Sequence, residues 1–235
     1  MNIKRLVKKA VKRLREGKKI CHGIDPYCDM KARYPEAFSV VFDVGANDGR
    51  SAVQFVKEFK MANVYCFEPV RSTYEELESN FGSHARVRPF NFAFGASETT
   101  AVVEFDKNDN SRCNTLKLDT SDNIDAESVT VTTLDKFCQD QNVQRIDFLK
   151  IDTEGFDLEV LKGSQKYLEE QRISFLQVEA SMNPLNTKHV KFEDLKSHLE
   201  SYGYVLFGIY DQTLEWSGQT RLRFTNPIFI SNKFV

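Results

Sequence analysis

The residues with the clearest chemical potential begin at the end of a predicted strand over 39–44, in the motif VFDVGANDG (41–49). Ligands of open α/β sheets bind beyond the carboxyl ends of the strands, and glycines there let the backbone approach the ligand closely. A dinucleotide fingerprint would have a glycine where Asn47 stands. The motif therefore favours a ligand without a pyrophosphate and argues against a nicotinamide-dependent dehydrogenase.

A second motif, CFEP (66–69), ends the next predicted strand and places Glu68 23 residues after Gly45. A carboxylate at this point suits hydrogen bonds from two ribose hydroxyls. A nucleoside without a diphosphate on such a sheet points to S-adenosylmethionine (SAM). The residues that we expect to bind it are Asp43, Gly45, Ala46, Asn47, Gly49, Ser51, Glu68 and Pro69.

A third motif, FLKIDTEGF (148–156), precedes VLKG (160–163). With the first two motifs, NFAFG (91–95), TLDKF (133–137) and QVE (177–179), it resembles the FkbM family of SAM-dependent methyltransferases over about residues 39–182. The resemblance implies a class I Rossmann-like fold and methylation of a hydroxyl on a sugar, glycan or natural product. It adds Asn91, Ala93 and Asp152 to the expected cofactor-binding residues.

Methyl transfer to a hydroxyl needs a positioned acceptor and a group that removes its proton, because an alkyl hydroxyl is a very weak acid. The candidates at predicted strand ends are Asp152, Glu154 and Glu179, and His189 follows a predicted active-site loop, 181–188. Two versions are open. The carboxylates act as base and positioner, or they bind a divalent cation, for which oxygen ligands favour magnesium or manganese over zinc.

Alternating strand and helix patterns predict an α/β fold with a mostly parallel sheet covered by helices on both faces. The predicted strands are 39–44, 63–67, 87–94, 146–151, 174–178, 204–209 and 227–230. The predicted helices are 51–59, 72–81 with Ser72 as N-cap, 158–168 and 192–201. Segments 101–105 and 128–132 alternate like the strands of an inserted β-hairpin around a polar loop, 106–125. The 19 Phe predict a core rich in phenylalanine.

The charge of the chain is uneven, although its net value is only -2. Residues 1–19 hold nine Lys or Arg and one Glu, with an apolar stripe at Ile3, Leu6, Val7, Ala10, Val11 and Leu14. This pattern predicts a basic amphipathic helix. We divide the chain into this helix with its connector, 1–37, and a methyltransferase domain, 38–235. The stripe either packs on the domain or lies on an anionic membrane.

Composition narrows the remaining alternatives. The five Cys are odd in number and form no CxxC pair, which favours reduced thiols in the cytoplasm, with or without contact at the inner face of a membrane. The acidic body argues against a nucleic-acid partner. A noncatalytic SAM-fold binding protein and methylation of a different acceptor atom stay open, as does the oligomeric state. The expected partner is a small-molecule or glycan acceptor.

Overall fold

The structure, a computed structural model, describes residues 22–34, 38–104, 115–117, 126–215 and 220–235. Its helices are α2 (Pro26–Arg33), α3 (Arg50–Glu58), α4 (Arg71–Phe81), α5 (Leu134–Asp140), α6 (Asp157–Lys162), α7 (Gln165–Glu169), α8 (Phe192–Ser201) and the short η1 (Asn232–Phe234). Its strands are β1 (Val40–Val44), β2 (Asn63–Phe67), β3 (Val87–Phe90), β4 (Ala93–Phe94), β5 (Thr99–Glu104), β6 (Thr115–Lys117), β7 (Ala126–Thr132), β8 (Ile146–Ile151), β9 (Ile173–Gln177), β10 (Ala180–Ser181), β11 (Tyr204–Leu214) and β12 (Leu222–Ser231).

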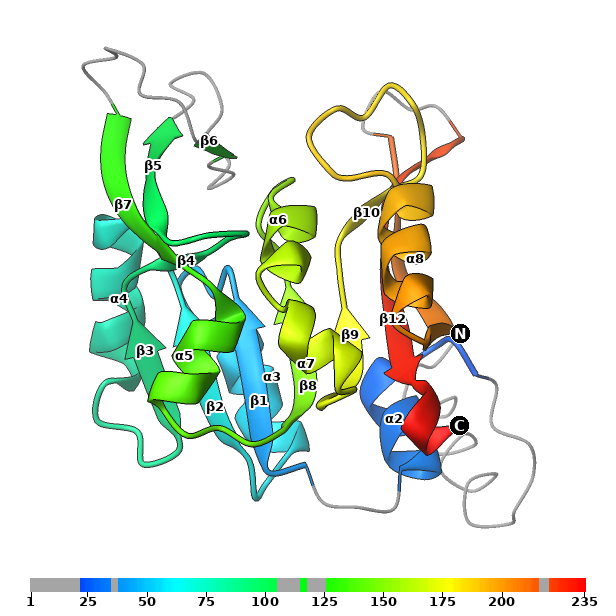
Figure 1. The fold of residues 1–235 in the computed structure, drawn as a ribbon, viewed down its shortest axis with the longest axis horizontal. Coiled ribbons are helices and arrows are strands. Elements are labelled where there is room, and N and C mark those ends of the chain that lie inside the picture. Colours follow the sequence, from blue (N-terminus) through cyan, green and yellow to red (C-terminus); the bar gives the residue numbers. More distant parts are fainter. Residues whose placement is uncertain (1–21, 35–37, 105–114, 118–125, 216–219) are drawn as a thin grey trace, which may run out of the picture.

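The main sheet has the order β10-β12-β9-β8-β1-β2-β3, with β11 beside β12 (Figure 1). The strands β9, β8, β1, β2 and β3 are parallel to one another, whereas β12 is antiparallel to β9, β10 and β11. The predicted mostly parallel α/β sheet is therefore confirmed. The carboxyl ends of β1, β2 and β8 meet at one edge, where polar side chains that follow them can converge.

Helices cover both faces of this sheet, as the sequence predicted (Figure 1). Side chains of β1 alternate, so Phe42 packs in the core with α5, α6, α7 and α8, while Val41 packs with α2, α3 and α4. Phenylalanine dominates the largest fully buried side chains, which confirms the expected core. Each such ring contributes roughly 1.5–3 kcal/mol by leaving water.

A second, four-stranded sheet has the order β4-β7-β5-β6. The antiparallel pair β5 and β7 confirms the predicted hairpin insertion, and most of the polar loop between them lies outside the described residues. The strand region predicted over 87–94, with an interruption at Pro89, is two strands that divide after Phe90, because β3 belongs to the main sheet and β4 to the second one. The chain turns at Asn91, whose side-chain amide donates to the carbonyls of Glu68 and Pro69.

Three further expectations need correction. Ser72 does not cap α4, which begins at Arg71 after Val70 and has no side-chain cap. The single helix predicted over 158–168 is two helices, α6 and α7, and they are separated at Gly163, which packs against the Gly95 carbonyl. The segment 134–140 forms α5, a helix that the sequence analysis did not assign.

None of the described helices is long and apolar enough to span a membrane. The basic helix predicted over 1–19 lies outside the described residues, as do residues 20, 21 and 35–37 of the connector, whereas 22–34, with α2, are described.

Candidate cofactor and acceptor site

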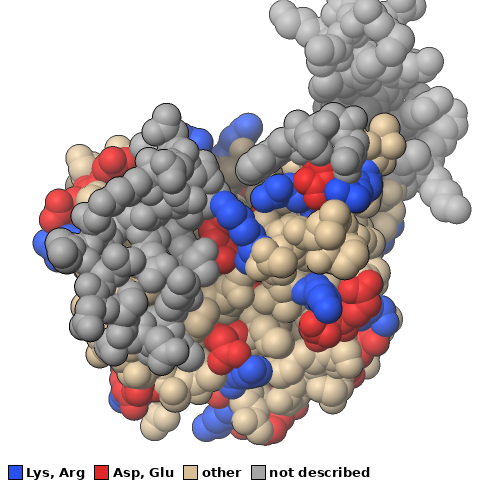
Figure 2. Space-filling model, turned by 90° about the horizontal axis from the view of Figure 1, so that it is seen from above, with Lys and Arg blue, Asp and Glu red and all other residues tan. Residues whose placement is uncertain are grey.

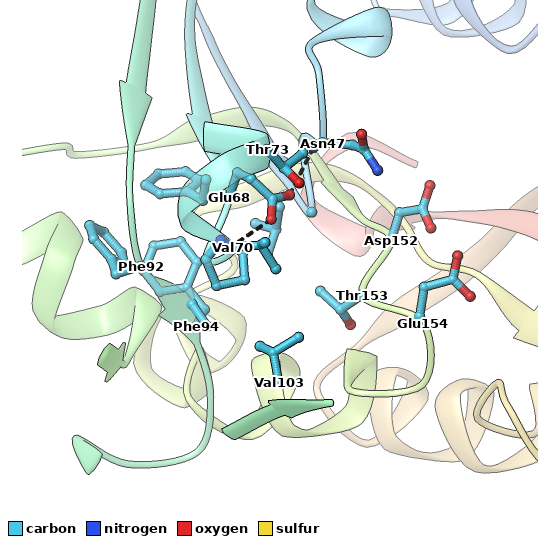
Figure 3. A pocket seen from close by; sticks show the side chains of 15 residues that line it. Asn47, Glu68, Val70, Thr73, Phe92, Phe94, Val103, Asp152, Thr153 and Glu154 are labelled. Carbon is cyan, nitrogen blue, oxygen red and sulfur yellow. Dashed lines mark hydrogen bonds between the residues drawn. The ribbon is translucent and has the colours of Figure 1, made fainter. Parts of the chain in front are cut away.

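A cavity of about 140 Å³, open to solvent, lies beyond the carboxyl ends of β1, β2 and β8. In Figure 3, the rings of Phe92 and Phe94 lie toward one end and the carboxylates of Asp152 and Glu154 toward the other. The remaining lining residues are Val44, Gly45, Asn47, Phe67, Glu68, Pro69, Val70, Thr73, Ala93, Val103 and Thr153. Seen from above, the corresponding face of the molecule is hollowed, with acidic and basic side chains around the hollow (Figure 2).

Glu68 joins two of the loops around this cavity. Its carboxylate accepts hydrogen bonds from the backbone N–H groups of Asn47 at 3.0 Å and Val70 at 2.9 Å. Each carboxylate oxygen has a second acceptor position, so the group keeps capacity for hydroxyl donors. Burial raises the pKa of Glu68 to about 7, although the two backbone N–H groups lower it.

The two glycines of the first motif have different structural roles. Gly45 has a φ of +78°, and a Cβ on it would overlap the carbonyl oxygen of Asp152, so this loop approaches the β8 loop more closely than another residue allows. Gly49 is the N-cap residue before α3, and a Cβ there would meet Phe81 and Leu77 of α4. Gly49 lines neither the cavity nor a second, polar hollow that adjoins it. Its contacts are those between two packed helices.

A second, polar hollow adjoins the cavity and shares Gly45, Asn47 and Asp152 with it. Ala46 and Ser51 line this hollow, so these two predicted residues lie beside the cavity. Asn91 lines neither hollow, because its amide holds the turn after Glu68. Asn91 and Ala93 were both predicted to bind the cofactor, and of these two residues Ala93 lines the cavity.

Lys150 was missed by the sequence analysis. It lies in β8 with a nearly buried side chain, and its Nζ is 3.3 Å from Asp43 Oδ1 and 3.0 Å from Asp152 Oδ2. Burial lowers the pKa of Lys150, but the two carboxylates outweigh it and raise the pKa overall. Asp43 is fully buried, which raises its pKa against the effect of Lys150. Asp43 therefore faces this ammonium group and lines neither hollow.

Glu154, Glu179 and His189 converge behind the acidic end of the cavity. His189 Nε2 lies 2.9 Å from Glu179 Oε2 and 3.6 Å from Glu154 Oε2. Burial raises the pKa of Glu179 to about 7, against the hydrogen bond from His189. Burial lowers the pKa of His189, but the two carboxylates raise it overall. Three of the four predicted catalytic residues thus meet, whereas Asp152 pairs with Lys150.

The loop that carries Glu154 is held in an unusual conformation. Glu154 has a φ of +53°, and Gly155 has a φ of +105° with its Cα against the Lys188 carbonyl. Asp157, also missed by the sequence analysis, is fully buried and accepts hydrogen bonds from Thr153 Oγ1 at 2.6 Å and Glu179 N at 3.1 Å. Burial raises the pKa of Asp157 to about 6. Such strain is typical of loops that position functional side chains.

Comparison with known proteins agrees with this geometry. The fold is that of class I SAM-dependent methyltransferases, and it is similar to the METTL16 MTase domain with a TM-score of 0.52, at 9% identity over 87% of this chain and 64% of that one. Residues 43–206 match the model of the methyltransferase FkbM domain. The chain belongs to the FkbM family.

Two relatives are similar in sequence. The hexuronic acid methyltransferase AglP of Haloferax volcanii is 28% identical over 151 residues, 63% of this chain and 59% of the relative. The 2-O-methyltransferase NoeI of Sinorhizobium fredii is 25% identical over 152 residues, 58% of this chain and 61% of the relative. The matched part of the chain thus spans about three fifths of each relative's length.

Proposed function

We propose that this protein transfers the methyl group of SAM to a hydroxyl group of a sugar or glycan. The observation that carries the proposal is the Glu154 carboxylate, which lines the cavity and has the buried Glu179–His189 pair behind it. The names of the two relatives, a hexuronic acid methyltransferase and a 2-O-methyltransferase, support a sugar hydroxyl as acceptor.

The residues around the cavity fit the cofactor. Gly45 lets the first-motif loop pack against the Asp152 carbonyl beside the cavity, and Glu68 offers two carboxylate oxygens to ribose hydroxyls. The apolar end, with Phe92, Phe94 and Val70, suits the flat adenine ring. When bound, SAM supplies an activated methyl group on a positively charged sulfur. Asp152, shared by both hollows, lies between this apolar end and the polar hollow of the first motif.

Glu154 is the proposed catalytic base. As the hydroxyl oxygen forms its bond to the methyl carbon and the carbon–sulfur bond breaks, the hydroxyl proton passes to the Glu154 carboxylate. Glu179 and His189 line neither hollow, so we assign them to the support of Glu154 and not to contact with the acceptor. The loop 181–190 borders this side and is a proposed acceptor loop, as is 106–127, most of which lies outside the described residues.

The test is mass spectrometry of glycan and metabolite extracts after incubation with the protein and isotopically labelled SAM. We expect labelled methyl in a sugar-containing product, and loss of that product in Glu154→Gln. Glu193→Gln is the matched control, because Glu193 is an exposed carboxylate at the start of α8 and should leave the yield unchanged. Equal yields from wild type and Glu154→Gln would refute the role of Glu154.

A further inference from the structure

His189 faces the two carboxylates with Nε2, and its other ring nitrogen, Nδ1, lies 2.7 Å from the side-chain nitrogen Nδ2 of Asn186. Asn186, His189 and Glu179 are all more than nine-tenths buried. The cluster can bind a cation only if Nε2 of His189 carries no proton. The contacts of Asn186 with Nδ1 therefore bear on whether the cluster binds a cation or holds a proton.

The orientation of the Asn186 amide follows from four backbone and ring contacts. Its Oδ1 accepts from the backbone N–H groups of Lys188 at 3.1 Å and His189 at 3.4 Å. Its Nδ2 donates to the backbone carbonyl of Arg223 in β12 at 3.1 Å. A backbone N–H can only donate and a carbonyl can only accept, so turning the amide over would break all three bonds.

The atom that faces His189 Nδ1 is therefore an NH₂ group, and Nδ1 must accept. A neutral ring that accepts at Nδ1 carries its proton on Nε2, the nitrogen that lies 2.9 Å from Glu179 Oε2. The ring of Phe224, with its centroid 5.0 Å from that of His189, packs on the imidazole and limits its rotation.

The same geometry bears on the cation alternative. Ligand atoms of Glu154, Glu179 and His189 all lie within 4.8 Å of one another, which is close enough to surround an ion. A histidine that binds a metal through Nε2 must lose that proton, and its other ring nitrogen then usually donates an N–H to an acceptor. Asn186 presents a donor at that position, so it opposes the metal-binding tautomer.

We infer that Asn186 is a positioning residue that holds His189 as its Nε2–H tautomer, so that the Glu154–Glu179–His189 cluster is a hydrogen-bonded proton site and not a metal site. The further consequence rests on the proposed function. His189 keeps the carboxylate of Glu179 in place and faces that of Glu154, which orients the proposed base toward the acceptor.

The test is long-range proton–nitrogen NMR of protein labelled with ¹⁵N-histidine, in which His189 is assigned by the loss of its signals in His189→Gln. At a pH above the raised pKa of His189, where the ring is neutral, we expect an unprotonated Nδ1 and a protonated Nε2. We also expect an equimolar amount of Mn²⁺ to leave the His189 signals sharp. An Nδ1–H tautomer of the neutral ring, or selective broadening of His189 by Mn²⁺, would overturn the inference.

Asn186→Asp places a carboxylate oxygen opposite Nδ1 and should shift that nitrogen to the protonated form. Asn183→Ser is the matched control, because Asn183 ties the same loop to the Leu222 carbonyl of β12 but does not contact His189. It should leave the His189 spectrum unchanged. In Asn186→Ser we expect kcat to fall by roughly ten- to a hundredfold with unchanged affinity for S-adenosylhomocysteine (SAH). A wild-type kcat in that variant would refute the positioning role, and the wild-type spectrum tests the tautomer even if methyl transfer is never found.

Discussion

Replacing Glu68 by glutamine tests the link between the cavity and the cofactor. The glutamine keeps one oxygen, so one of the two backbone N–H groups, of Asn47 or Val70, comes to face an NH₂ group. One ribose hydroxyl loses its acceptor for the same reason. A buried polar group left without a partner costs about 1–3 kcal/mol, which corresponds to a roughly 5- to 150-fold weaker affinity for SAH.

The pH dependence gives the same test a second readout. Burial raises the pKa of Glu68 to about 7, and Asp43 and Glu127 add to the rise, whereas the backbone N–H groups of Val70 and Asn47 reduce it. The ionised form accepts both hydroxyls, so we expect wild-type affinity for SAH to fall as pH drops through about 7. Glu68→Gln should lack this change.

Linkage also predicts the sign of the stability change. Because the pKa of Glu68 in the folded protein lies above the ordinary value of 4.5, the folded protein binds more protons than the unfolded one between pH 4.5 and about pH 7. The contribution of Glu68 to the free energy of unfolding therefore decreases as pH rises through that window. Glu68→Gln should remove this part of the slope in denaturant titrations.

Calorimetry with SAH on both sides of pH 7 measures these effects. The matched control is Glu193→Gln, because Glu193 is an exposed carboxylate at the start of α8 and lies outside the cavity. We expect that control to change the binding free energy by less than about 0.5 kcal/mol. Wild-type SAH affinity in folded Glu68→Gln would refute the ribose assignment.

The remaining predictions concern turnover, stability and the basic segment. Glu154→Gln and Asp152→Asn should each lower kcat, and the fall should be about 10²–10⁴-fold for Glu154, the proposed base. Calorimetry should show unchanged affinity for SAH in both variants. Full activity in either variant contradicts the role of the residue that it replaces. Turnover should persist in EDTA. If EDTA abolishes turnover and added Mg²⁺ or Mn²⁺ restores it, the cation-binding version is favoured. Lys150→Met leaves the Asp43 carboxylate buried without its cation, so it should lower the free energy of unfolding, measured in urea, by about 3–5 kcal/mol. The double variant Lys150→Met/Asp43→Asn should recover part of this free energy. Full-length protein, but not a form starting at Ile20, should float with anionic and not with neutral vesicles; absence of flotation at physiological salt contradicts membrane contact by residues 1–19.

The sequence predicted the parts of the site that depend on strand ends. Asp152 and Glu68 follow buried strands, and parallel neighbours bring their carboxyl ends to one edge, so the motifs located the cavity without coordinates. Glu179 and His189 were also named, but their contact was not, because it joins a residue just after β9 to a histidine ten residues further along the chain.

Other features depend on packing between segments that are distant in sequence. Lys150 has the position of an ordinary strand residue, and only the pairing of β8 with β1 brings it to Asp43. Gly49 belongs to the cofactor motif in sequence, yet its environment is set by Phe81 on another helix. The role of Asn186 depends on the carbonyl of Arg223, 37 residues later in the chain.

The most direct test of the central claim is NMR of the reaction with SAM that carries a ¹³C-labelled methyl group. The chemical shift of that methyl group in the product distinguishes attachment to oxygen from attachment to nitrogen, carbon or sulfur. With a glycan or uronic acid acceptor, we expect an O-methyl signal that forms as SAH accumulates and that is lost in Glu154→Gln. A labelled methyl group on nitrogen, carbon or sulfur would contradict it.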